Sequence, residues 1–324
     1  MSSKQQILPS EAILEQYGTL LKDKTILITG VSNDSIAGEL AVQLSSASPA
    51  LLILSARSKS RVEPIVSKIA AKTPKVSTRF LQMDLGTLKD IQRAVASLHD
   101  VPKIHHIAAV AGVMIPPYGT TVDGVETQFG VNYLANFALV KLLLPKVEAA
   151  GASSSIVIVA SSAVRGGVVS FDNIGYDDGK TYNPLVAYGQ SNAARVMFVK
   201  SLAKKLLDKK IRTYSIDPGA VRSGLQRHVT SEMRAFIEEK RASVLFDADG
   251  REYKLPPWTS TSEGAATIIT GMIDPTIEHS NGSFLHNNAI ADQELHSHIL
   301  NEDNWARLWE LSENLIGEKF AIDQ

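Results

Sequence analysis

The chain has 324 residues and no cysteine, and its 33 basic and 34 acidic residues leave a net charge of −1. The lack of cysteine excludes disulfides, thiolate metal sites and a cysteine nucleophile. The balanced charge argues against nucleic acid and anionic membranes as partners. No apolar run approaches the ~20 residues that span a bilayer, and the polar start carries no signal-peptide core. We therefore expect a cytoplasmic protein without a membrane span.

Residues 1–23 are expected to form a polar arm and a short helix with Ser10 as its N-cap. After them, short apolar runs that are typical of buried strands alternate with amphipathic runs that are typical of helices. The strands are expected at 25–30, 51–54, 76–83, 104–109, 155–160 and 211–216. The helices are expected at 36–44, 61–71, 88–98, 122–147 with an interruption near Pro145, and from Tyr188 onward. This alternation predicts an α/β fold of the Rossmann-like type, a doubly wound parallel sheet in a single domain of residues 1–324.

The C-terminal third is predicted to complete this domain. Residues 220–258 are irregular apart from a helix near 230–240, and we interpret them as a lid over the crevice at the strand ends. A helix at 259–272, a last strand at 282–285 and a terminal helix at 303–316 follow. Right-handed crossovers place the ends of the fourth, fifth and sixth strands beside one crevice.

Hydroxyl groups follow the fifth strand and begin the next helix. The apolar run 156–160 ends in Ser161-Ser162, and Tyr188 opens a long helical pattern after a loop rich in glycine and aspartate. A buried strand that presents a hydroxyl and a helix that presents a phenol can together bind a carbonyl oxygen and supply it with a proton.

These and other landmarks occur in the order found in one family. They are Thr29-Gly30, Asp84, Ala111-Gly112, Asn132, Ser162, Tyr188 and Pro218-Gly219. The chain resembles the short-chain dehydrogenase/reductase family over residues 22–320, and its longer C-terminal part resembles the retinol-dehydrogenase-like branch. The resemblance implies NADP(H) as cofactor and apolar alcohols or ketones as substrates. It also implies a homodimer or tetramer formed through the helices at 122–147 and 185–208.

The resemblance also implies a role for individual residues. Ser162 would hydrogen-bond the substrate carbonyl, Tyr188 would be the general acid or base, and Asn132 would support a water. The cofactor would be bound by Gly30, Ser32, Ser35, Ile36, Arg57, Asp84, Leu85, Ala111, Gly112, Pro218, Gly219 and Val221. The family carries a lysine four residues after the tyrosine, and this chain carries Asn192 there.

The neutral Asn192 changes the chemistry expected of Tyr188. An unperturbed tyrosine has a pKa near ~10, and without a neighbouring cation little of it is ionised at pH 7. Alcohol oxidation needs a base, whereas carbonyl reduction needs only a proton donor, so we expect reduction to be favoured. The alternative is that another cation, Arg195 or Arg165, replaces the lysine. Arg195 lies about two helical turns beyond Tyr188, on a compatible face.

The loop after the first strand also departs from the family. Ser35 and Ala37 stand where glycines are expected for close backbone approach. Asp34 either faces the cofactor phosphate, where it would cost ~1 kcal/mol or more, or points to solvent. After the second strand Arg57 appears and no acidic residue does, which suits the 2′-phosphate of NADP.

Three functions follow from this pattern. The first is NADP(H)-linked reduction of a carbonyl on an apolar small molecule, with the binding of NADP retained, weakened or lost. The second is a non-redox enzyme on the same scaffold, an isomerase, dehydratase or cyclase that uses Ser162 and Tyr188 as donors. The third is a catalytically inactive binding protein. No metal site is expected, because His105 and His106 have no acidic neighbour at ligand spacing.

Overall fold

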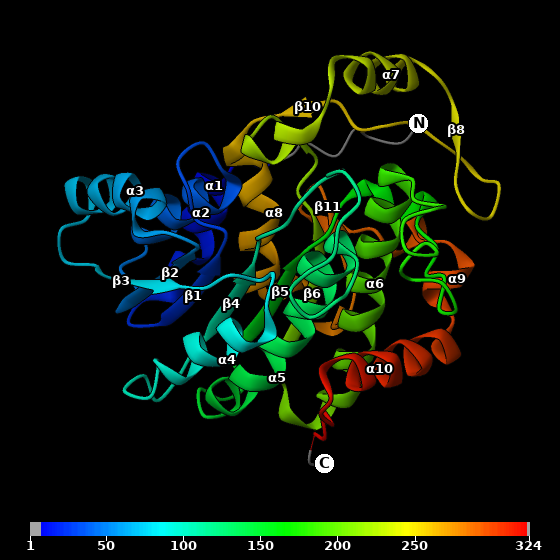
Figure 1. Ribbon diagram of the computed structural model, residues 1–324. Helices are drawn as coiled ribbons and strands as arrows, with labels where there is room; N and C mark the ends of the chain where they lie inside the picture. Colours follow the sequence, from blue (N-terminus) through cyan, green and yellow to red (C-terminus); the bar gives the residue numbers. More distant parts are fainter. Residues whose placement is uncertain (1–7, 323–324) are drawn as a thin grey trace.

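The computed structural model describes residues 8–322, and its centre is one eight-stranded sheet (Figure 1). The strand order is β12-β11-β6-β5-β4-β1-β2-β3, and every pair is parallel except β11–β12. The strands are β1 (Thr25–Thr29), β2 (Leu51–Ala56), β3 (Ser77–Gln82), β4 (His106–Ala109), β5 (Ser155–Val159), β6 (Arg212–Asp217), β11 (Phe284–His286) and β12 (Ala289–Ile290). The predicted doubly wound sheet is confirmed, and the order reverses between β1 and β4.

The inner strands of the sheet are buried on both faces, which explains why β1 and β5 are nearly continuous apolar runs, while the edge strand β3 is more polar and only partly buried. Successive side chains of a strand point to opposite faces. In β1, Leu27 joins one apolar core, while Ile26 and Ile28 join the other. The same alternation divides β5, where Ile156 faces the first core and Val157 the second.

Two layers of helices cover the sheet. One layer contains α1 (Ser10–Tyr17), α2 (Ile36–Ser45), α3 (Lys59–Lys72) and α8 (Thr261–Ile273). The other contains α4 (Leu88–Ala96), α5 (Ala135–Glu148), α6 (Pro184–Lys205), the short α9 (Ser297–Leu300) and α10 (Glu302–Ile316). Helix α1 begins one residue after Pro9, so Ser10 is its first helical residue and not its N-cap. Its hydroxyl bonds that of Ser262 at 2.9 Å, so this part of the expected arm packs on α8.

The helix expected over 122–147 differs from the prediction in two ways. Residues 122–126 are not helical, because the chain pairs back on itself between Thr120 and Glu126, and the helical turns begin at Thr127. A π-helix (Phe129–Leu134) follows and continues directly into α5. The predicted interruption at Pro145 is wrong, since Pro145 lies within α5 and the helix continues to Glu148.

The segment 220–258 lies across the end of the sheet where β4, β5 and β6 finish, with α7 (Ser231–Ala242) at the top of Figure 1. The helix expected near 230–240 is α7, and none of its residues is buried. A short hairpin, β8 (Leu245–Phe246) and β9 (Glu252–Tyr253), follows it. Strand β10 (Trp258–Thr259) then pairs with β7 (Ala220–Val221) at the base of the segment.

The C-terminal helix covers the helices through which the resemblance implied a dimer. Helix α10 packs against α6. Trp309 of α10 stacks on Phe320, and both rings contact Phe137 of α5, at centroid distances of 5.1 and 5.3 Å. Lys141 of α5 pairs with Glu318. An assembly through this face of α5 and α6 would therefore have to displace α10, while the oligomer itself stays a prediction.

No helix among residues 8–322 is long and apolar enough to cross a membrane. Six of the connecting segments within residues 8–322 contain 3₁₀ turns: Gly18–Leu21, Ser162–Gly166, Leu207–Lys209, Gly224–His228 with a kink at Gln226, Pro275–Ser280 and Asp292–Glu294. The second of these segments, directly after β5, begins at one of the serines singled out in the sequence.

Candidate active site

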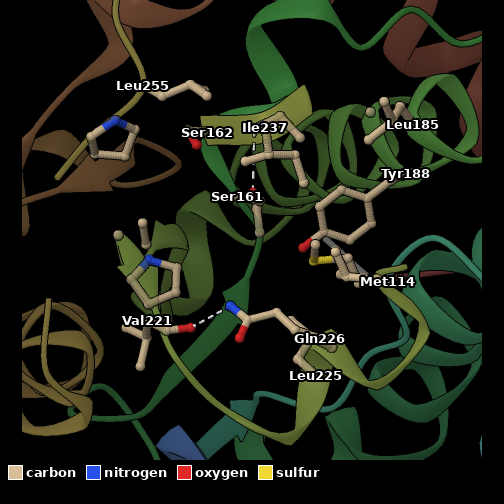
Figure 2. A pocket seen from close by; sticks show the side chains of 18 of the residues that line it. Met114, Ser161, Ser162, Leu185, Tyr188, Val221, Leu225, Gln226, Ile237 and Leu255 are labelled. Carbon is tan, nitrogen blue, oxygen red and sulfur yellow. Dashed lines mark hydrogen bonds between the residues drawn. The ribbon is translucent and has the colours of Figure 1, made fainter. Parts of the chain in front are cut away.

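Two adjoining cavities open where the parallel strands end, as the crossover argument predicts. The first, of about 440 Å³, lies between the loops after β4, β5 and β6, the start of α6 and the segment 220–258 (Figure 2). The second, of about 460 Å³, follows the loop after β1 toward β2 and β3. The two share Ile36, Val110, Gly112, Val113, Ser223 and Leu225 in their walls. A long ligand can therefore lie in the second cavity, which we call the groove, and reach into the first, which we call the chamber.

Tyr188 lies on the first turns of α6 and points its phenol into the chamber (Figure 2). The helix is fixed at its start by Asn183, whose side chain accepts hydrogen bonds from the amides of Leu185 and Val186, and by Pro184 at its first position. Burial raises the pKa of the Tyr188 phenol, and the positive charge of Arg195 opposes that rise. The neutral phenol is therefore the form present at neutral pH, and it can donate a proton.

The serine whose hydroxyl lies beside the phenol is Ser161, while the role predicted for Ser162 toward a substrate carbonyl stays a prediction. The Ser161 side chain lies against Tyr188 and lowers its pKa, whereas the Ser162 hydroxyl points toward Leu255 (Figure 2). The cause is the strand end. Ser161 is still extended and caps the 3₁₀ segment by accepting a hydrogen bond from the amide of Ala163 at 3.2 Å, while Ser162 is already its first helical residue. Both serines line the chamber, so the sequence pattern alone could not predict which of the two hydroxyl groups lies beside Tyr188.

Asn132 lies in the π-helix below the chamber and holds the loop after β4. Its side-chain oxygen accepts from the amide of Val113 at 2.8 Å, and its amide donates to the Val113 carbonyl at 2.9 Å and to Ser191 at 3.0 Å. π-Helical turns often mark functional positions. The backbone carbonyl of Asn132 is left to accept side-chain donors, one from Asn136 and one from Arg195.

Asn192 and Arg195 lie behind the phenol on α6. The Asn192 amide donates to the backbone carbonyl of Tyr188 at 2.8 Å, and its side chain also lowers the Tyr188 pKa. The Arg195 guanidinium donates from Nε to the carbonyl of Asn132, from Nη2 to the carbonyl of Ala111 at 2.7 Å and from Nη1 to Asn192 Oδ1 at 3.3 Å. Arg195 is 3% exposed and lines the chamber.

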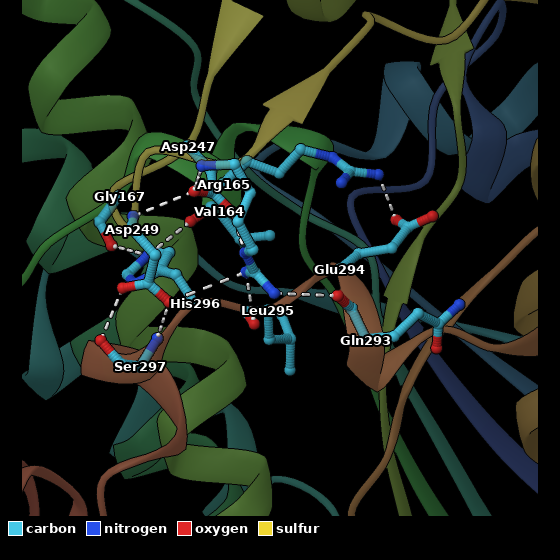
Figure 3. Close-up of polar contacts among 11 residues, drawn as sticks. Val164, Arg165, Gly167, Asp247, Asp249, Gln293, Glu294, Leu295, His296 and Ser297 are labelled. Atoms are coloured by element: carbon cyan, nitrogen blue, oxygen red, sulfur yellow. Dashed lines mark hydrogen bonds and ion pairs between the residues drawn. The ribbon is translucent and has the colours of Figure 1, made fainter.

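Arg165, the other cation considered as a replacement for the lysine, is engaged elsewhere (Figure 3). Its guanidinium pairs with Glu294 at 2.5 Å and lies over the ring of Tyr253. Glu294 in turn contacts His286, and this contact is the reason that the His286 pKa is raised despite burial. Asp217 at the end of β6 is also buried near His286, and burial raises its pKa.

The groove begins at Gly30, the last residue before the loop. Gly30 has φ +79°, and a Cβ there would come within 2.8 Å of the Ala111 Cα, so glycine is required by conformation and by space. The Thr29 hydroxyl accepts from the amides of Val110 and Ala111, each at 3.1 Å. The ends of β1 and β4 are thereby held together beside Ala111 and Gly112, both of which line the groove.

The loop after β1, which departs from the family's glycine pattern, is stabilised by contacts among its own residues. Ser35 caps α2 by accepting from the Gly38 amide at 2.9 Å, and its hydroxyl also donates to the Ser32 carbonyl at 2.7 Å. Gly38, one residue beyond Ala37, provides the close approach, since a Cβ there would lie 2.3 Å from the Ser32 carbonyl oxygen. Asp34 is exposed with φ +56° and accepts from Asn33, outside the residues that line the groove. Of its two expected orientations, the solvent-facing one is found.

Three arginines gather at the far end of the groove, beyond β2. Arg57 and Arg61 lie near the start of α3, and Arg227 comes from the segment 220–258. Burial lowers the pKa of Arg227, and the nearby positive charges of Arg57 and Arg61 lower it further. None of the three forms an ion pair among residues 8–322. Arg227 was not assigned to the cofactor from the sequence, because only the fold brings the lid segment to this place.

The remaining predicted residues divide between the two cavities. Ser32, Ser35, Asp84 and Leu85 line the groove, Pro218, Gly219 and Val221 line the chamber, and Ile36 lines both. His105 and His106 have structural roles: His105 accepts from the Thr25 amide at 3.0 Å, and burial lowers the pKa of His106 to about 3. Residues 8–322 contain no group of three or more potential metal ligands.

The chain matches the model of the family described as short chain dehydrogenase over residues 24–234. It is 28% identical over 309 residues to retinol dehydrogenase 14 of Mus musculus, covering 92% of this chain and 87% of the relative. It is 31% identical over 296 residues to retinol dehydrogenase 12 of Mus musculus, covering 91% and 86%.

Solved structures share the fold. A short chain dehydrogenase from Burkholderia cenocepacia in complex with NADP superposes with a TM-score of 0.62 at 18% identity, covering 83% of this chain and 99% of that one. A short-chain dehydrogenase/reductase from Serratia marcescens superposes with a TM-score of 0.61 at 18% identity, covering 82% and 96%.

Proposed function

We propose that this chain, which belongs to the short-chain dehydrogenase family, is an oxidoreductase that uses NADP(H) and favours reduction of a carbonyl on an apolar small molecule. The observation that supports this most is the continuity of the two cavities. A groove with arginines at one end and close-packed glycines at the other leads into a chamber that contains a buried phenol and a serine. An extended dinucleotide in the groove would place its reactive end beside Tyr188.

A nicotinamide dinucleotide, when bound, supplies the hydride for reduction or removes it for oxidation. The protein handles the proton and the orientation of the substrate. Ser161 and Tyr188 both line the chamber, and the Ser161 hydroxyl lies close enough to lower the pKa of the Tyr188 phenol, so a carbonyl oxygen bound beside them would accept from both. Tyr188 would then give its proton to that oxygen as the hydride reaches the carbon. Because burial keeps the phenol neutral at pH 7, the donor form is the populated one.

The preference for NADP rests on the charges at the far end of the groove. Arg57, Arg61 and Arg227 surround the position after β2, where an enzyme specific for NAD carries an acid for the ribose hydroxyls. Guanidinium groups form charge-assisted hydrogen bonds with phosphate. Asp84 also lines the groove, but its carboxylate is turned to its own loop and accepts from the Gly86 amide at 2.9 Å.

The preference for an apolar substrate rests on the walls of the chamber. Side chains from three elements contribute apolar surface, including Met114, Leu185, Val221, Phe236, Ile237 and Leu255. The relatives are named for retinol, an alcohol with a long apolar body, and a chamber of this volume and lining suits that class.

The test is turnover of NADPH and of NADH with a series of apolar aldehydes and ketones, in the unmodified protein and in Arg57→Ala and Arg227→Ala. We expect NADPH to be consumed and each substitution to raise the KM for NADPH about tenfold or more, since hydrogen bonds to a charged group contribute ~1.5–3 kcal/mol. The KM for NADH should change little. Absence of NADPH binding at millimolar concentration, or turnover of substrate without any nucleotide, would contradict the proposal.

A further inference from the structure

The family's lysine is absent, yet a buried cation occupies the region behind Tyr188. The Arg195 guanidinium is held by the carbonyls of Asn132 and Ala111 and by the side chain of Asn192, and none of these partners is a carboxylate. A buried cation without an anionic partner is unfavourable, because desolvation is not offset by an opposite charge. Retaining one at this position calls for a group that benefits from the charge.

We propose that Arg195 replaces the missing lysine as the cation that stabilises the ionised form of Tyr188. The charge would thus come from two turns beyond the tyrosine instead of one. Arg195 acts through Tyr188, so it is a positioning residue for the reaction, and its role rests on the proposed function of that site. Residue 192 would then hold the cation through a hydrogen bond to Arg195 and would not itself carry the positive charge.

The substitution at 192 and the placement of Arg195 depend on each other. The short Asn192 side chain leaves room for the guanidinium and accepts a hydrogen bond from it at 3.3 Å. Gly112 leaves room on the other side, since a Cβ there would lie 3.2 Å from Arg195 Nη2. Asn132 ties the π-helix to the same guanidinium through its carbonyl. Three elements are therefore arranged around one cation.

The charges that face Tyr188 support this assignment. Arg195 is the cation that lowers the Tyr188 pKa, and Asp217, a buried carboxyl at the end of β6, acts in the opposite direction. Burial lowers the pKa of Arg195 to about 10, so it remains charged at pH 7, and ionised Tyr188 stabilises that charge. Arg165 does not take this role, because it is paired with Glu294.

The direct test follows the ionisation of Tyr188 by NMR in protein labelled with ¹³Cζ-tyrosine, and Tyr188→Phe identifies the resonance. Arg195→Gln should raise the Tyr188 pKa by about one unit, which is a tenfold fall in tyrosinate at a fixed pH. Arg195→Lys should restore most of the difference. This readout needs no turnover, so it separates failure of the inference from failure of the proposed reaction.

A second variant tests whether the charge is transferable along the helix. Asn192→Lys combined with Arg195→Gln returns the cation to the position that the family uses and should recover the Tyr188 pKa and the pH dependence of alcohol oxidation. Arg307→Gln, which removes an exposed arginine paired with Asp172, is the matched control and should change neither. Thermal unfolding of each variant shows whether it is folded.

Kinetics give the complementary measurement. Arg195→Gln should lower kcat for alcohol oxidation about tenfold and shift its alkaline limb upward, with a smaller effect on carbonyl reduction, because only oxidation needs the ionised phenol. An unchanged Tyr188 titration in folded Arg195→Gln would overturn the inference. So would a large gain in neutral-pH oxidation from Asn192→Lys with Arg195 intact, because it would mean that no cation was acting before.

Discussion

The groove and the chamber are built in different ways, although they meet at one strand edge. The groove is made by turns at the ends of β1, β2 and β4, where backbone lies against backbone and a single Cβ would clash. Much of the chamber wall comes from the segment 220–258, in which α7 buries none of its residues. Most of the groove is therefore a fixed shape, to which the segment 220–258 adds residues 223–225 and Arg227, whereas the chamber has one whole wall that is held by few contacts.

The two cavities also differ in how departures from the family pattern are accommodated. The two departures in the loop after β1 are matched by neighbouring contacts: Ser35 caps α2, and Gly38 supplies the close approach. Beside the chamber, the Arg195 guanidinium donates to Asn192, the residue that stands in place of the family's lysine. The chamber wall shows no such matching, because an apolar surface made by a loosely held segment can accept different side chains.

The largest effect on catalysis should come from removing the proposed proton donor, the Tyr188 hydroxyl in the chamber. Tyr188→Phe keeps the ring and removes the phenol hydroxyl, so the NADPH affinity should be unchanged while kcat falls by about 10²–10⁴-fold. Steady-state kinetics and NADPH fluorescence titration measure the two quantities. Tyr17→Phe, in which the lost hydroxyl accepts only a hydrogen bond from the adjacent Gln16 among the described residues, is the control and should retain full activity. Retained turnover in Tyr188→Phe would remove the phenol from the mechanism.

A glycine pair distinguishes the fixed groove from an ordinary turn. Gly30 and Gly124 both have φ +79°, but a Cβ at Gly30 would lie 2.8 Å from the Ala111 Cα, whereas a Cβ at Gly124 would meet nothing within 4 Å. Gly124→Ala should cost about 1 kcal/mol of unfolding free energy through its conformation alone. Gly30→Ala should cost a further ~1–3 kcal/mol from the clash and should also weaken NADPH binding.

Chemical denaturation and NADPH titration of the two variants provide the comparison. Equal losses of stability, with NADPH binding intact in both variants, would mean that the close approach at Gly30 has no part in holding the cofactor.

The sequence was sufficient where the signal is a repeated pattern. Continuous apolar runs such as 156–160 indicate a strand buried on both faces, and the order of strands and helices then places Tyr188 and Gly112 at one crevice, with Asn132 beside Gly112. It was insufficient where one rotamer or one bond decides. Ser161 and Ser162 are adjacent, and their side chains point in different directions only because the first residue is still extended while the second begins the 3₁₀ segment. The Asp34 side chain is directed to solvent by its positive φ and by its hydrogen bond with Asn33.

The positions of Arg227 and Arg195 could not be predicted, because the residues that they meet are far away in the sequence. Arg227 lines the groove only because the segment 220–258 crosses the groove, and no local sequence pattern predicts that crossing. Arg195 was on the correct face, but its direction depends on the carbonyl of Asn132, which a π-helix in a separate segment provides. A regular α-helix was the expectation there, and single π turns leave no periodic signal to predict them.

A smaller effect should identify the serine of the chamber. Ser161→Ala should lower kcat/KM about 10–100-fold, because it removes a hydrogen bond to an oxygen that gains charge in the transition state. Ser162→Ala removes the adjacent hydroxyl, which points toward Leu255, and should lower kcat/KM less than about threefold. The reverse order would return the role to Ser162. Because Ser161 also caps its 3₁₀ segment, thermal unfolding of both variants must accompany the kinetics.

The smallest effect on kinetics should come from weakening the contacts that hold the segment 220–258 in place, without changing any residue that lines the chamber. Arg251 at the end of the hairpin donates to the carbonyl of Gln293 at 3.2 Å and to that of Leu295 at 2.7 Å, and it pairs with Asp247 at 2.7 Å. Asp249 in the same hairpin accepts from the Ser297 amide at 2.8 Å (Figure 3). These contacts fasten 245–253 to the segment 292–297 and thereby hold the lid in place.

Arg251→Ala should raise the KM for an apolar substrate a few-fold, because a less ordered wall must be fixed when substrate binds. The KM for NADPH should be unchanged, since the groove does not depend on this hairpin. Limited proteolysis should cut the lid faster in this variant. Lys254→Ala, which removes a nearby exposed cation that makes no hydrogen bond or ion pair within residues 8–322, controls for the loss of charge. If the two substitutions raise both KM values alike, the chamber and the groove are not the mechanically separate parts that their construction indicates.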